Sequence, residues 1–526
     1  MSVLEKASSL GAAFNSNERE PAQRCLPQTR EAILGQLWDW AYSDYARCLC
    51  WLEGIAGSGK SAIAQTIAER CAKIGILAAS FFFSQRHSER SNPIRLFPTI
   101  ALQLAINIPQ TRDAIYQAIS DNLLLPHQLF RDQFRSLIVN PLLMHTGSLT
   151  SPMIIVIDAL DECDRDELVQ EIISLFIQNS QASQFHLHVL VTSRPQVHIK
   201  AKITAPDSLG SVRVFHLHEF RADADICTFL HESFIDIQKR RQYTIMGDAR
   251  QQPSDDVIDA IVRDASGLFI FVSTVTNFID TKDYLPERRL LQILDVERQP
   301  GLLKHTDLDR LYLDIVSAQS NDSIVMGTVV LLFTPLPVQE LARLLNKEAR
   351  EVYLLLEGLR SVILVPEKET DPVCIYHTSF RDFLVDSERS LQCHVDPSMY
   401  HADISKFCLQ LLVKELKQDL CDIHDPSKLN SELLDRKRLC DESIPKSVQY
   451  ACHYWAFHLV ESLPNENLLH YLTEFTHKSL LYWIEALSLL HYFEDCAISS
   501  LQMVKLWLKV VYSYLSSHQC AESFPL

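Results

Sequence analysis

The sequence predicts an α/β domain, built on a parallel sheet with helices on both faces, followed by mostly helical modules. Between about residues 48 and 220, short runs of β-branched and aromatic residues alternate with helical patterns, which is typical of strands joined by crossover helices. Beyond residue 220 such runs nearly vanish and helical periods take over. Only 13 of the 526 residues are glycine, well under the roughly 7% of average usage, which favours long helices with few tight turns.

Five apolar runs in the first region have the length and composition of buried strands. We expect strands at 49–53, 78–84, 153–158, 188–192 and 212–217. Between the first two runs, apolar residues from Ile63 to Ile74 recur at helical spacing on one stripe. This stretch predicts an amphipathic helix that packs on the sheet.

Changes of pattern divide the chain into five segments. Two helical stretches after residue 305 are followed by apolar runs at 361–365 and 373–376 with a polar turn between them, which predicts the two-stranded wing of a winged-helix domain. We expect a short N-terminal tail at 1–20, the α/β domain at 21–220, a small helical domain at 221–304, the winged-helix domain at 305–392 and an all-α C-terminal domain at 393–526.

Composition and charge argue against several classes of protein. The formal net charge of −17 opposes the phosphate neutralisation that dominates nucleic-acid affinity. The 14 cysteines show no disulfide-framework spacing, which fits a reducing compartment. The N-terminal residues lack the pattern of a secretory signal, and the apolar, uncharged stretch 323–339 is too short to span a bilayer. We therefore expect a cytoplasmic protein with no nucleic-acid partner and no membrane partner.

The strongest motif directly follows the first predicted strand and directly precedes the predicted helix. Its pattern is G-x-x-x-x-G-K-[ST], in which glycines let backbone N–H groups close around phosphate oxygens and the helix N-terminus adds the positive end of its dipole. Lys60 would hold the β- and γ-phosphates of a nucleoside triphosphate, ATP or GTP, and Ser61 would bind Mg²⁺. The motif consists of Gly54, Ile55, Ala56, Gly57, Ser58, Gly59, Lys60 and Ser61. The α/β domain is therefore predicted to be a P-loop nucleotide domain.

A second motif combines a buried strand with a cluster of acids. The apolar run 153–157 ends in Asp158, and Asp161 and Glu162 follow within one turn. The strand would bring Asp158 to the Mg²⁺ beside the P-loop, because this ion prefers hard oxygen ligands. Glu162, or Asp161 in its place, could orient or deprotonate the attacking water. A strand end that carries only solvated acids is the alternative.

The predicted strand at 188–192 ends in a polar tip that includes Arg194. At the carboxyl edge of the sheet, Arg194 could reach the γ-phosphate and report its presence. The alternative is a structural ion pair between Arg194 and a nearby acid.

Two His-x-His pairs lie on predicted strands or beside them: His186 with His188, and His216 with His218. This spacing would place both rings of a pair on one face of a strand, which is compatible with metal binding. Neither pair has a cysteine or a carboxylate in a ligand-like array along the sequence, so we do not expect zinc at either pair.

In their order and spacing, several segments resemble the NACHT family of STAND P-loop NTPases, and in detail the fungal NOD-like receptors whose nucleotide domain is described as nephrocystin-3-like at its N-terminus. These segments are WLEGIAGSGKSAIAQTIAE, SFFFSQ, IIVIDALDEC, LVTSRP, GLFIFVST, TPLPVQELARLL and YHTSFRDFL. The resemblance implies a nucleotide-controlled switch. A diphosphate-bound closed form would be held by the winged-helix domain, and exchange for triphosphate would permit opening and oligomerisation, by self-association or with NACHT-protein partners.

The resemblance also assigns residues outside the P-loop. His377 matches the winged-helix histidine of the family, which would contact the diphosphate; a wing histidine that contacts only protein is the alternative. After Gly267, related switches often carry a proline that touches the base, and Phe269 stands here instead. Family members usually also have an N-terminal effector domain and C-terminal sensor repeats, and neither is recognisable in this sequence.

Three functions are compatible with these features. The first is a STAND-type switch with slow hydrolysis of ATP or another triphosphate, acting in innate-immunity-like or incompatibility signalling. The second is a P-loop small-molecule kinase or another metabolic NTPase; the acidic cluster, which suits attack by water, favours the first. The third is a truncated, non-enzymatic regulator of full-length NACHT receptors.

Overall fold

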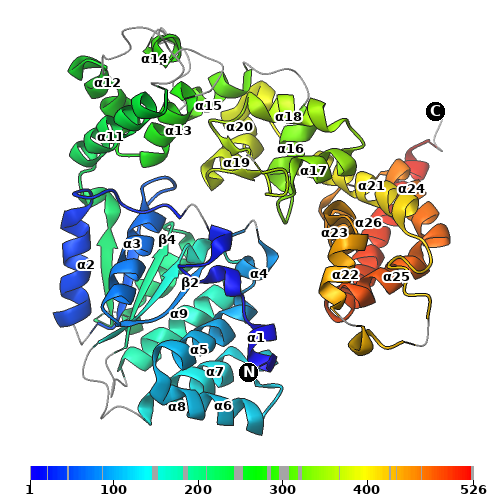
Figure 1. Ribbon diagram of the computed structural model, residues 1–526, viewed down its shortest axis with the longest axis horizontal. Coiled ribbons are helices and arrows are strands. Elements are labelled where there is room, and N and C mark those ends of the chain that lie inside the picture. Colours follow the sequence, from blue (N-terminus) through cyan, green and yellow to red (C-terminus); the bar gives the residue numbers. More distant parts are fainter. Residues whose placement is uncertain are drawn as a thin grey trace. The chain divides into compact units, whose positions relative to one another are not determined.

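The computed structural model divides into two compact units, Met1–Thr276 and Asn277–Leu526 (Figure 1). The first unit contains the large sheet, and the second is almost entirely helical. The residues that the structure describes are 2–19, 22–43, 47–85, 87–144, 152–181, 187–208, 210–241, 253–280, 286–294, 307–317, 323–366, 368–425, 428–433, 435–463 and 465–522.

The first unit is built on one sheet of five strands in the order β2-β3-β4-β1-β5 (Figure 1). The strands are β1 (Leu49–Glu53), β2 (Leu77–Phe82), β3 (Met153–Asp158), β4 (Leu187–Ser193) and β5 (Val212–His216). Every strand pair in this sheet is parallel, so the carboxyl ends of the strands lie along one edge. Glu53, at the end of β1, is in register with Ser193 of β4 on one side and with His216 of β5 on the other.

These strands confirm the predicted α/β class. β1 and β3 coincide with the predicted runs, and the others differ from them by one or two residues at one or both ends. At the end of β5 the difference has a local cause: Leu217 leaves the strand and begins a short 3₁₀ turn, Leu217–Glu219.

Helices cover both faces of the sheet, which explains why its central strands β3, β4 and β1 are buried along their whole length and are mostly apolar. Along β3, Ile154 and Val156 belong to one hydrophobic core, whereas Ile155 and Ile157 belong to the other. Successive side chains of a strand point to opposite faces, so a strand that is buried on both faces has no polar side. The helices that begin in the first unit are α1 (Ser2–Ala7), α2 (Glu31–Ser43), α3 (Lys60–Lys73), α4 (Ser88–Ser91), α5 (Leu96–Asn107), α6 (Arg112–Asp121), α7 (Phe130–Phe134), α8 (Asn140–Leu143), α9 (Asp166–Gln181), α10 (Val197–Ile203), α11 (Asp223–Arg241), α12 (Asp255–Ala265) and α13 (Phe269–Ile279). Residues of α2 and α3 contribute to the core on one face, and residues of α5 and α9 to the core on the other.

The second unit begins with helices and a short antiparallel ribbon of β6 (Ile363–Leu364) and β7 (Cys374–Ile375). The ribbon lies where the sequence predicts a two-stranded wing, while the winged-helix assignment itself stays a prediction. The helices of this unit are α14 (Pro286–Leu294), α15 (Asp307–Ser317), α16 (Ser323–Leu331), α17 (Val338–Leu345), α18 (Ala349–Glu357), α19 (Thr378–Val385), α20 (Ser387–Ser390), α21 (Pro397–Glu415), α22 (Arg436–Ser443), α23 (Lys446–Glu461), α24 (Glu466–Lys478), α25 (Leu480–Leu489) and α26 (Ile498–Glu522).

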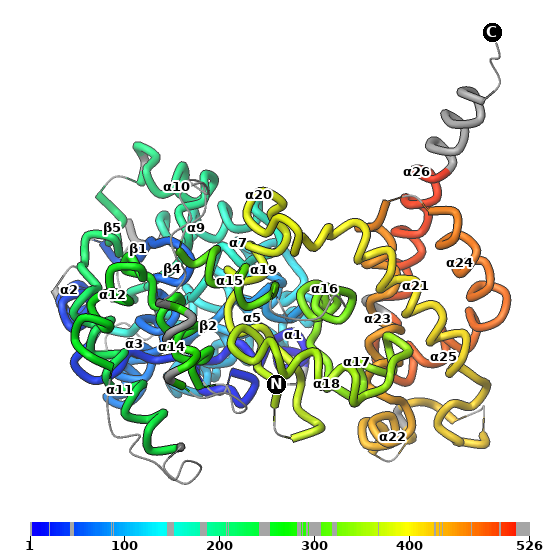
Figure 2. The backbone as a smooth tube through the Cα atoms, turned by 90° about the horizontal axis from the view of Figure 1, so that it is seen from above, coloured from blue at the N-terminus to red at the C-terminus, as the bar shows by residue number. Residues whose placement is uncertain are grey.

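The last of these helices pack around a core of aromatic side chains. Figure 2 shows α21, α23, α24, α25 and α26 gathered together, and α23 contacts α21, α25 and α26. Within this group the ring of Trp455 lies 5.1 Å from that of Phe475 and 5.8 Å from that of Trp483, measured between ring centroids. Large buried aromatic side chains of this kind dominate the packing energy of a small core.

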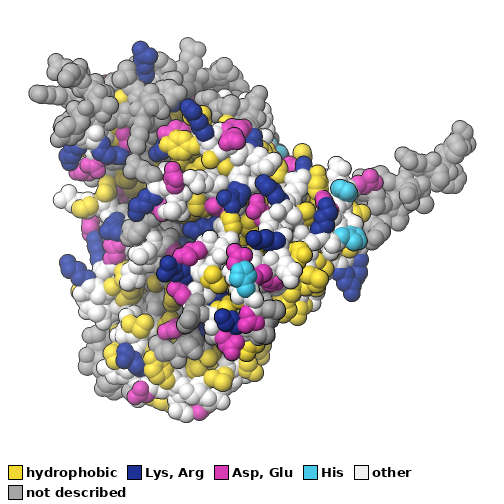
Figure 3. Space-filling view, turned by 45° about the vertical axis from the view of Figure 1, so that its right-hand side comes forward, with side chains coloured by type: hydrophobic (Ala, Val, Ile, Leu, Met, Phe, Trp, Pro, Cys, Tyr) yellow, Lys and Arg dark blue, Asp and Glu magenta, His cyan; other side chains and the backbone are white. Residues whose placement is uncertain are grey.

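The surface of the described residues carries both signs of charge. On the face shown in Figure 3, the side chains of Lys and Arg are interspersed with those of Asp and Glu. Among the described residues, no helix has both the length and the apolar character needed to cross a bilayer.

Candidate nucleotide-binding site

The predicted phosphate-binding loop connects the end of β1, at Glu53, to the start of α3, at Lys60. Gly57 and Gly59 have φ angles of 77° and 96°, in the left-handed region where a side chain is strained and glycine is not. At Gly57 there is a second requirement, because a Cβ atom would overlap the side chain of Ile270. The glycines of the motif are thus needed for this loop conformation.

The side chain of Lys60 folds back over the loop. Its Nζ donates hydrogen bonds to the carbonyl oxygens of Gly54 at 2.7 Å and Ile55 at 2.9 Å. Burial lowers the pKa of the Lys60 amine, and the carboxylates of Asp161 and Asp158 oppose this shift. The positive charge of Lys60 therefore lies at the loop, in the field of the acidic cluster.

Asp158 ends β3 at the carboxyl edge of the sheet and is 3% exposed. Its Oδ1 accepts a hydrogen bond of 2.6 Å from the hydroxyl of Thr192, on the neighbouring strand β4, and the side chain of Ser61 also bonds to this carboxylate. Burial raises the pKa of the Asp158 carboxyl, and the bonds from Thr192 and Ser61 oppose the rise. The structure thus brings together Ser61 and Asp158, the two residues that the sequence predicts as Mg²⁺ ligands.

Asp161 and Arg194 are bonded to each other. One carboxylate oxygen of Asp161 accepts from the backbone N–H of Arg194 at 3.0 Å, and the other lies 3.2 Å from its Nε. The Asp161 side chain is 5% exposed and that of Arg194 is 29% exposed. The ion pair that the sequence left as an alternative for Arg194 is therefore present, and it lies at the carboxyl edge of the sheet.

Glu162 lies beside this pair, at the end of the short turn Leu160–Glu162 that follows β3. Its Oε2 accepts a hydrogen bond of 3.2 Å from the backbone N–H of Gln85, just beyond β2. The turn begins after Ala159, whose φ of 55° reverses the chain and whose N–H donates to Thr192 at 3.1 Å. The acidic cluster is thus fixed by the strands on both sides of β3.

Two residues outside the predicted motifs, Arg30 and Ile270, also contact the P-loop. Arg30 donates from Nη2 to the carbonyl of Ser58 at 2.8 Å, and its guanidinium carbon lies 4.9 Å from the ring centre of Phe269. The N–H of Ile270 donates to the carbonyl of Gly57 at 3.2 Å. Phe269 and Ile270 belong to GLFIFVST, a segment of family resemblance, and no spacing rule links Arg30 or Ile270 to the loop.

His377 lies in the second unit, where it caps α19. Its Nδ1 accepts from the backbone N–H of Ser379 at 3.1 Å and is 2.8 Å from the hydroxyl of the same residue. An imidazole whose Nδ1 accepts a hydrogen bond carries its proton on Nε2. The contact between His377 and a diphosphate stays a prediction.

Comparison with protein families adds an independent observation on the first unit. Residues 28–194 match the family described as Nephrocystin 3, N-terminal. The matched range contains the P-loop and the acidic cluster and ends at Arg194. Residues 28–194 form a NACHT-like P-loop NTPase domain. A comparison with the curated proteins finds no match.

Solved structures with a similar arrangement have low sequence identity to this chain. One is a Signal Transduction ATPase with Numerous Domains (STAND) protein with a tetratricopeptide repeat sensor from Pyrococcus horikoshii, with 12% identity and a TM-score of 0.39, over 95% of this chain and 66% of that chain. This chain therefore spans just under two thirds of the length of that STAND protein. Another is the ORC1 protein of Aeropyrum pernix in complex with DNA (14% identity, TM-score 0.30, 69% of this chain and 92% of that one). A third is Cdc6p from Pyrobaculum aerophilum (13% identity, TM-score 0.30, 66% of this chain and 90% of that one).

Proposed function

We propose that the NACHT-like domain binds ATP with Mg²⁺ and acts as a STAND-type molecular switch with slow hydrolysis. The observation that carries the proposal is the convergence of the P-loop, Lys60, Ser61 and Asp158 at one edge of the sheet. A phosphate chain needs N–H donors, a positive charge and a hard cation, and this edge offers groups for all three.

The loop and α3 supply the contacts to phosphate. The N–H groups at the start of α3 and the glycine backbone of the loop can surround phosphate oxygens, since a helix N-terminus leaves its first N–H groups without helical partners. Lys60 now bonds to Gly54 and Ile55 of its own loop. A phosphate with a formal negative charge is a stronger acceptor than these carbonyls, so binding would draw the ammonium group to the nucleotide.

Ser61 and Asp158 fit a Mg²⁺ ion that accompanies the nucleotide. They offer a hydroxyl and a carboxylate in mutual contact, and Mg²⁺ prefers oxygen ligands and is usually held by one or two protein groups together with phosphate. Thr192 fixes the orientation of the carboxylate by donating to Oδ1. The ion would neutralise charge on the phosphate oxygens.

Hydrolysis requires a group that orients water, and Glu162 is the proposed base. It lies one residue from Asp161, whose carboxylate is committed to Arg194 on both oxygens. Because both carboxylate oxygens of Asp161 contact Arg194, we assign Asp161 to positioning Arg194. Arg194 would in turn respond to the γ-phosphate, because a phosphate competes with Asp161 for its guanidinium group.

A switch needs a path from the phosphates to other segments of the chain. The carbonyl of Gly57 accepts from Ile270 at the start of α13, and the carbonyl of Ser58 accepts from Arg30. A shift of the loop on exchange of diphosphate for triphosphate would therefore act on both segments. We propose that opening exposes surfaces for self-association or for NACHT-protein partners in innate-immunity-like or incompatibility signalling in the cytoplasm.

The decisive experiment compares Lys60→Ala with Lys73→Ala. Both lysines belong to α3, but Lys73 is exposed in its last turn. We expect Lys60→Ala to lose ATP binding by more than about 100-fold, because a charge-assisted contact to each of two phosphates is removed. Lys73→Ala should bind ATP as the wild type does. Equal affinity of the two variants in a fluorescent-nucleotide titration would overturn the proposal.

A second measurement separates a switch from a metabolic kinase. Protein purified from its native source is denatured, and the released nucleotide is identified by mass spectrometry. Copurifying ADP or ATP supports a switch that retains its nucleotide. Incubation with γ-labelled ATP should then release inorganic phosphate slowly, whereas label on a small metabolite would contradict the proposed hydrolysis.

A further inference from the structure

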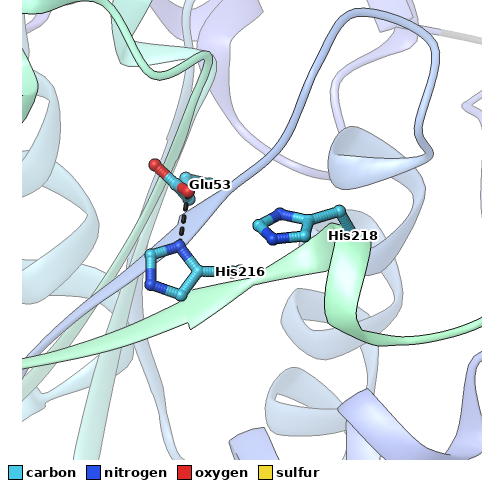
Figure 4. A group of neighbouring side chains, drawn as sticks. All are labelled: Glu53, His216 and His218. Atoms are coloured by element: carbon cyan, nitrogen blue, oxygen red, sulfur yellow. Dashed lines mark hydrogen bonds and ion pairs between the residues drawn. The ribbon is translucent and has the colours of Figure 1, made fainter.

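A second cluster of potential ligands lies at the same edge of the sheet, at the ends of β1 and β5. Glu53, His216 and His218 each offer a donor atom, and these atoms all lie within 4.8 Å of one another. Figure 4 shows the carboxylate of Glu53 above the ring of His216, with the ring of His218 beside them. Glu53 Oε1 and His216 Nδ1 are hydrogen-bonded, and the two ring centroids are 5.6 Å apart. Within the described part of the chain, this is the one group of three such side chains close enough to hold a metal ion.

The sheet register brings these residues together. Glu53 and His216 are Cα partners in the parallel pair of β1 with β5, and laterally paired residues of neighbouring strands project from the same face of a sheet. His218 lies two positions later, in the 3₁₀ turn Leu217–Glu219, and its ring centroid is 5.6 Å from that of His216. Leu217, between them, is buried and packs against Gly54. The pair of histidines is therefore held in place by a contact between Leu217 and the P-loop.

Glu53 carries the second observation that points to a ligand. Its side chain is only 10% exposed, and its Oε2 is buried without a hydrogen-bond partner among the described residues. A buried polar atom without a partner costs free energy, by about 1–3 kcal/mol for a neutral group and more for a charged one. A cation bound by this oxygen would remove that cost.

We propose that Glu53, His216 and His218 bind one divalent transition-metal ion of the zinc type. Two imidazoles and a carboxylate form a donor set that suits Zn²⁺, with bonds of about 2.0–2.2 Å and a fourth position for water. Such an ion places its donor atoms about 3.4 Å apart, so binding would draw together three donor atoms that now lie within 4.8 Å of one another. The site is separate in chemistry from the oxygen pair of Ser61 and Asp158, which suits Mg²⁺.

This site would act on the P-loop without taking part in nucleotide binding. Glu53 directly precedes Gly54, the first residue of the P-loop. An ion bound by both Glu53 and His216 would therefore link the start of the P-loop to the edge strand β5. The proposal does not depend on the proposed switch, because it rests only on residues outside the P-loop. The alternative is a plain hydrogen bond between Glu53 and His216 beside a solvated His218.

The test titrates metal into the full chain, prepared without a histidine tag, stripped with a chelator and free of nucleotide. Co²⁺ serves as the spectroscopic probe and Zn²⁺ is measured in competition with a chromogenic chelator. We expect one equivalent of tightly bound ion, with the visible absorption of tetrahedral Co²⁺. Its absence in the wild-type protein would overturn the proposal.

Matched variants locate the ion. His218 is exposed, so His218→Ala should fold and yet lose affinity by more than about 100-fold, since even the loss of an outer partner of a metal ligand costs 10- to 100-fold. Glu53→Gln should weaken binding similarly. His127→Ala, which removes another exposed histidine of the first unit, and Lys73→Ala, in the last turn of α3, should keep the ion. Unchanged affinity in His218→Ala, or loss of the ion in His127→Ala, would place it elsewhere and refute the assignment.

Discussion

Two strands of one sheet end in a buried carboxylate, and the two carboxylates have different neighbours. Asp158, at the end of β3, accepts from the hydroxyl groups of Thr192 and Ser61. Glu53, at the end of β1, bonds to the imidazole of His216, and its second oxygen has no partner among the described residues. Both are less than 10% exposed as whole residues. The same position in the fold therefore provides two chemically distinct environments.

The difference shows that the neighbours of a carboxylate, rather than its place at the sheet edge, decide which ion it can share. Hydroxyl and carboxylate oxygens are hard donors that suit Mg²⁺ with phosphate, whereas imidazole suits zinc and related metals. The P-loop lies between the two environments, because it begins at Gly54 directly after Glu53 and ends at Ser61 beside Asp158. One end of the loop is thus predicted to respond to nucleotide and the other to a metal.

The largest effect is expected for a third acid, Glu162, which unlike Asp158 and Glu53 is proposed to act in hydrolysis. Glu162→Gln should retain ATP but slow its hydrolysis by about 100- to 10,000-fold, the range attributed to a positioned general base. Glu167→Gln is the matched control, because Glu167 is an exposed acid in the first turn of α9. Phosphate release under single-turnover conditions measures both. Hydrolysis at the wild-type rate in Glu162→Gln would show that the acidic cluster has been misread.

The next effect separates the two buried carboxylates directly. Asp158→Asn should weaken the Mg²⁺ dependence of ATP binding by about 10- to 100-fold, since an amide replaces a charged oxygen ligand. The amide oxygen can still accept from Thr192, so the local structure should persist. His218→Ala, at the other end of the loop, should leave this Mg²⁺ dependence within about 3-fold of wild type if the two environments are independent. Equal losses in both variants, in Mg²⁺ titrations at fixed ATP, would mean that there is only one ion site.

Many of the residues that meet at this edge of the sheet could be predicted from the sequence, but others could not. The P-loop is contiguous, and Asp158 ends an apolar run, so parallel strands had to bring Asp158 and Ser61 to one edge. The contact between Glu53 and His216 spans 163 positions and depends on the register of β1 with β5, which no local pattern encodes. For this reason the sequence argued against a metal at His216 and His218. His186, of the other pair, lies outside the described residues, and His188 is fully buried with its ring edge-on to Trp40.

The contacts of Arg30 and Ile270 with the P-loop were missed for a similar reason. They join segments that are 28 and more than 200 positions from the loop, and neither segment has a periodicity that indicates a ligand. The sequence placed the end of the α/β domain at residue 220, where the strands stop. The compact unit extends to Thr276, and the bond between Ile270 and Gly57 lies in this additional part.

An effect of similar size is expected for His377, whose role the family resemblance implies. A charge-assisted bond from its imidazole to a diphosphate would be worth about 1.5–3 kcal/mol, or roughly 10- to 100-fold in the ratio of closed to open protein. His377→Ala should therefore release ADP faster and raise the oligomeric fraction, with less effect on ATP. His394→Ala, which removes a nearby histidine, is the control for a purely structural change. Stopped-flow release of labelled ADP together with light scattering measures both properties. Identical ADP release and identical oligomer size in His377→Ala and wild type would reduce His377 to the cap of α19.

The smallest expected effect returns to the two carboxylates, in protein free of nucleotide and of divalent ions. Burial raises the pKa of Asp158 in the folded state. At pH values between the pKa of the unfolded state, about 3.9, and this raised pKa, the folded protein therefore binds more protons than the unfolded protein. The contribution of Asp158 to the free energy of unfolding is therefore largest at low pH and is lost as the pH rises through this window. Asp158→Asn removes the cost of charging the buried group, so this variant should melt at a higher temperature than wild type at pH 7, by about 2–4 °C for each kcal/mol gained. The difference should shrink toward pH 4.

Glu53→Gln should show a smaller rise in melting temperature at pH 7, because it removes the unpartnered charged oxygen but also weakens the hydrogen bond with His216. Thermal melts in EDTA at the two pH values measure both variants. An equal or larger rise in Glu53→Gln would mean that hydroxyl and imidazole neighbours stabilise a buried carboxylate equally well.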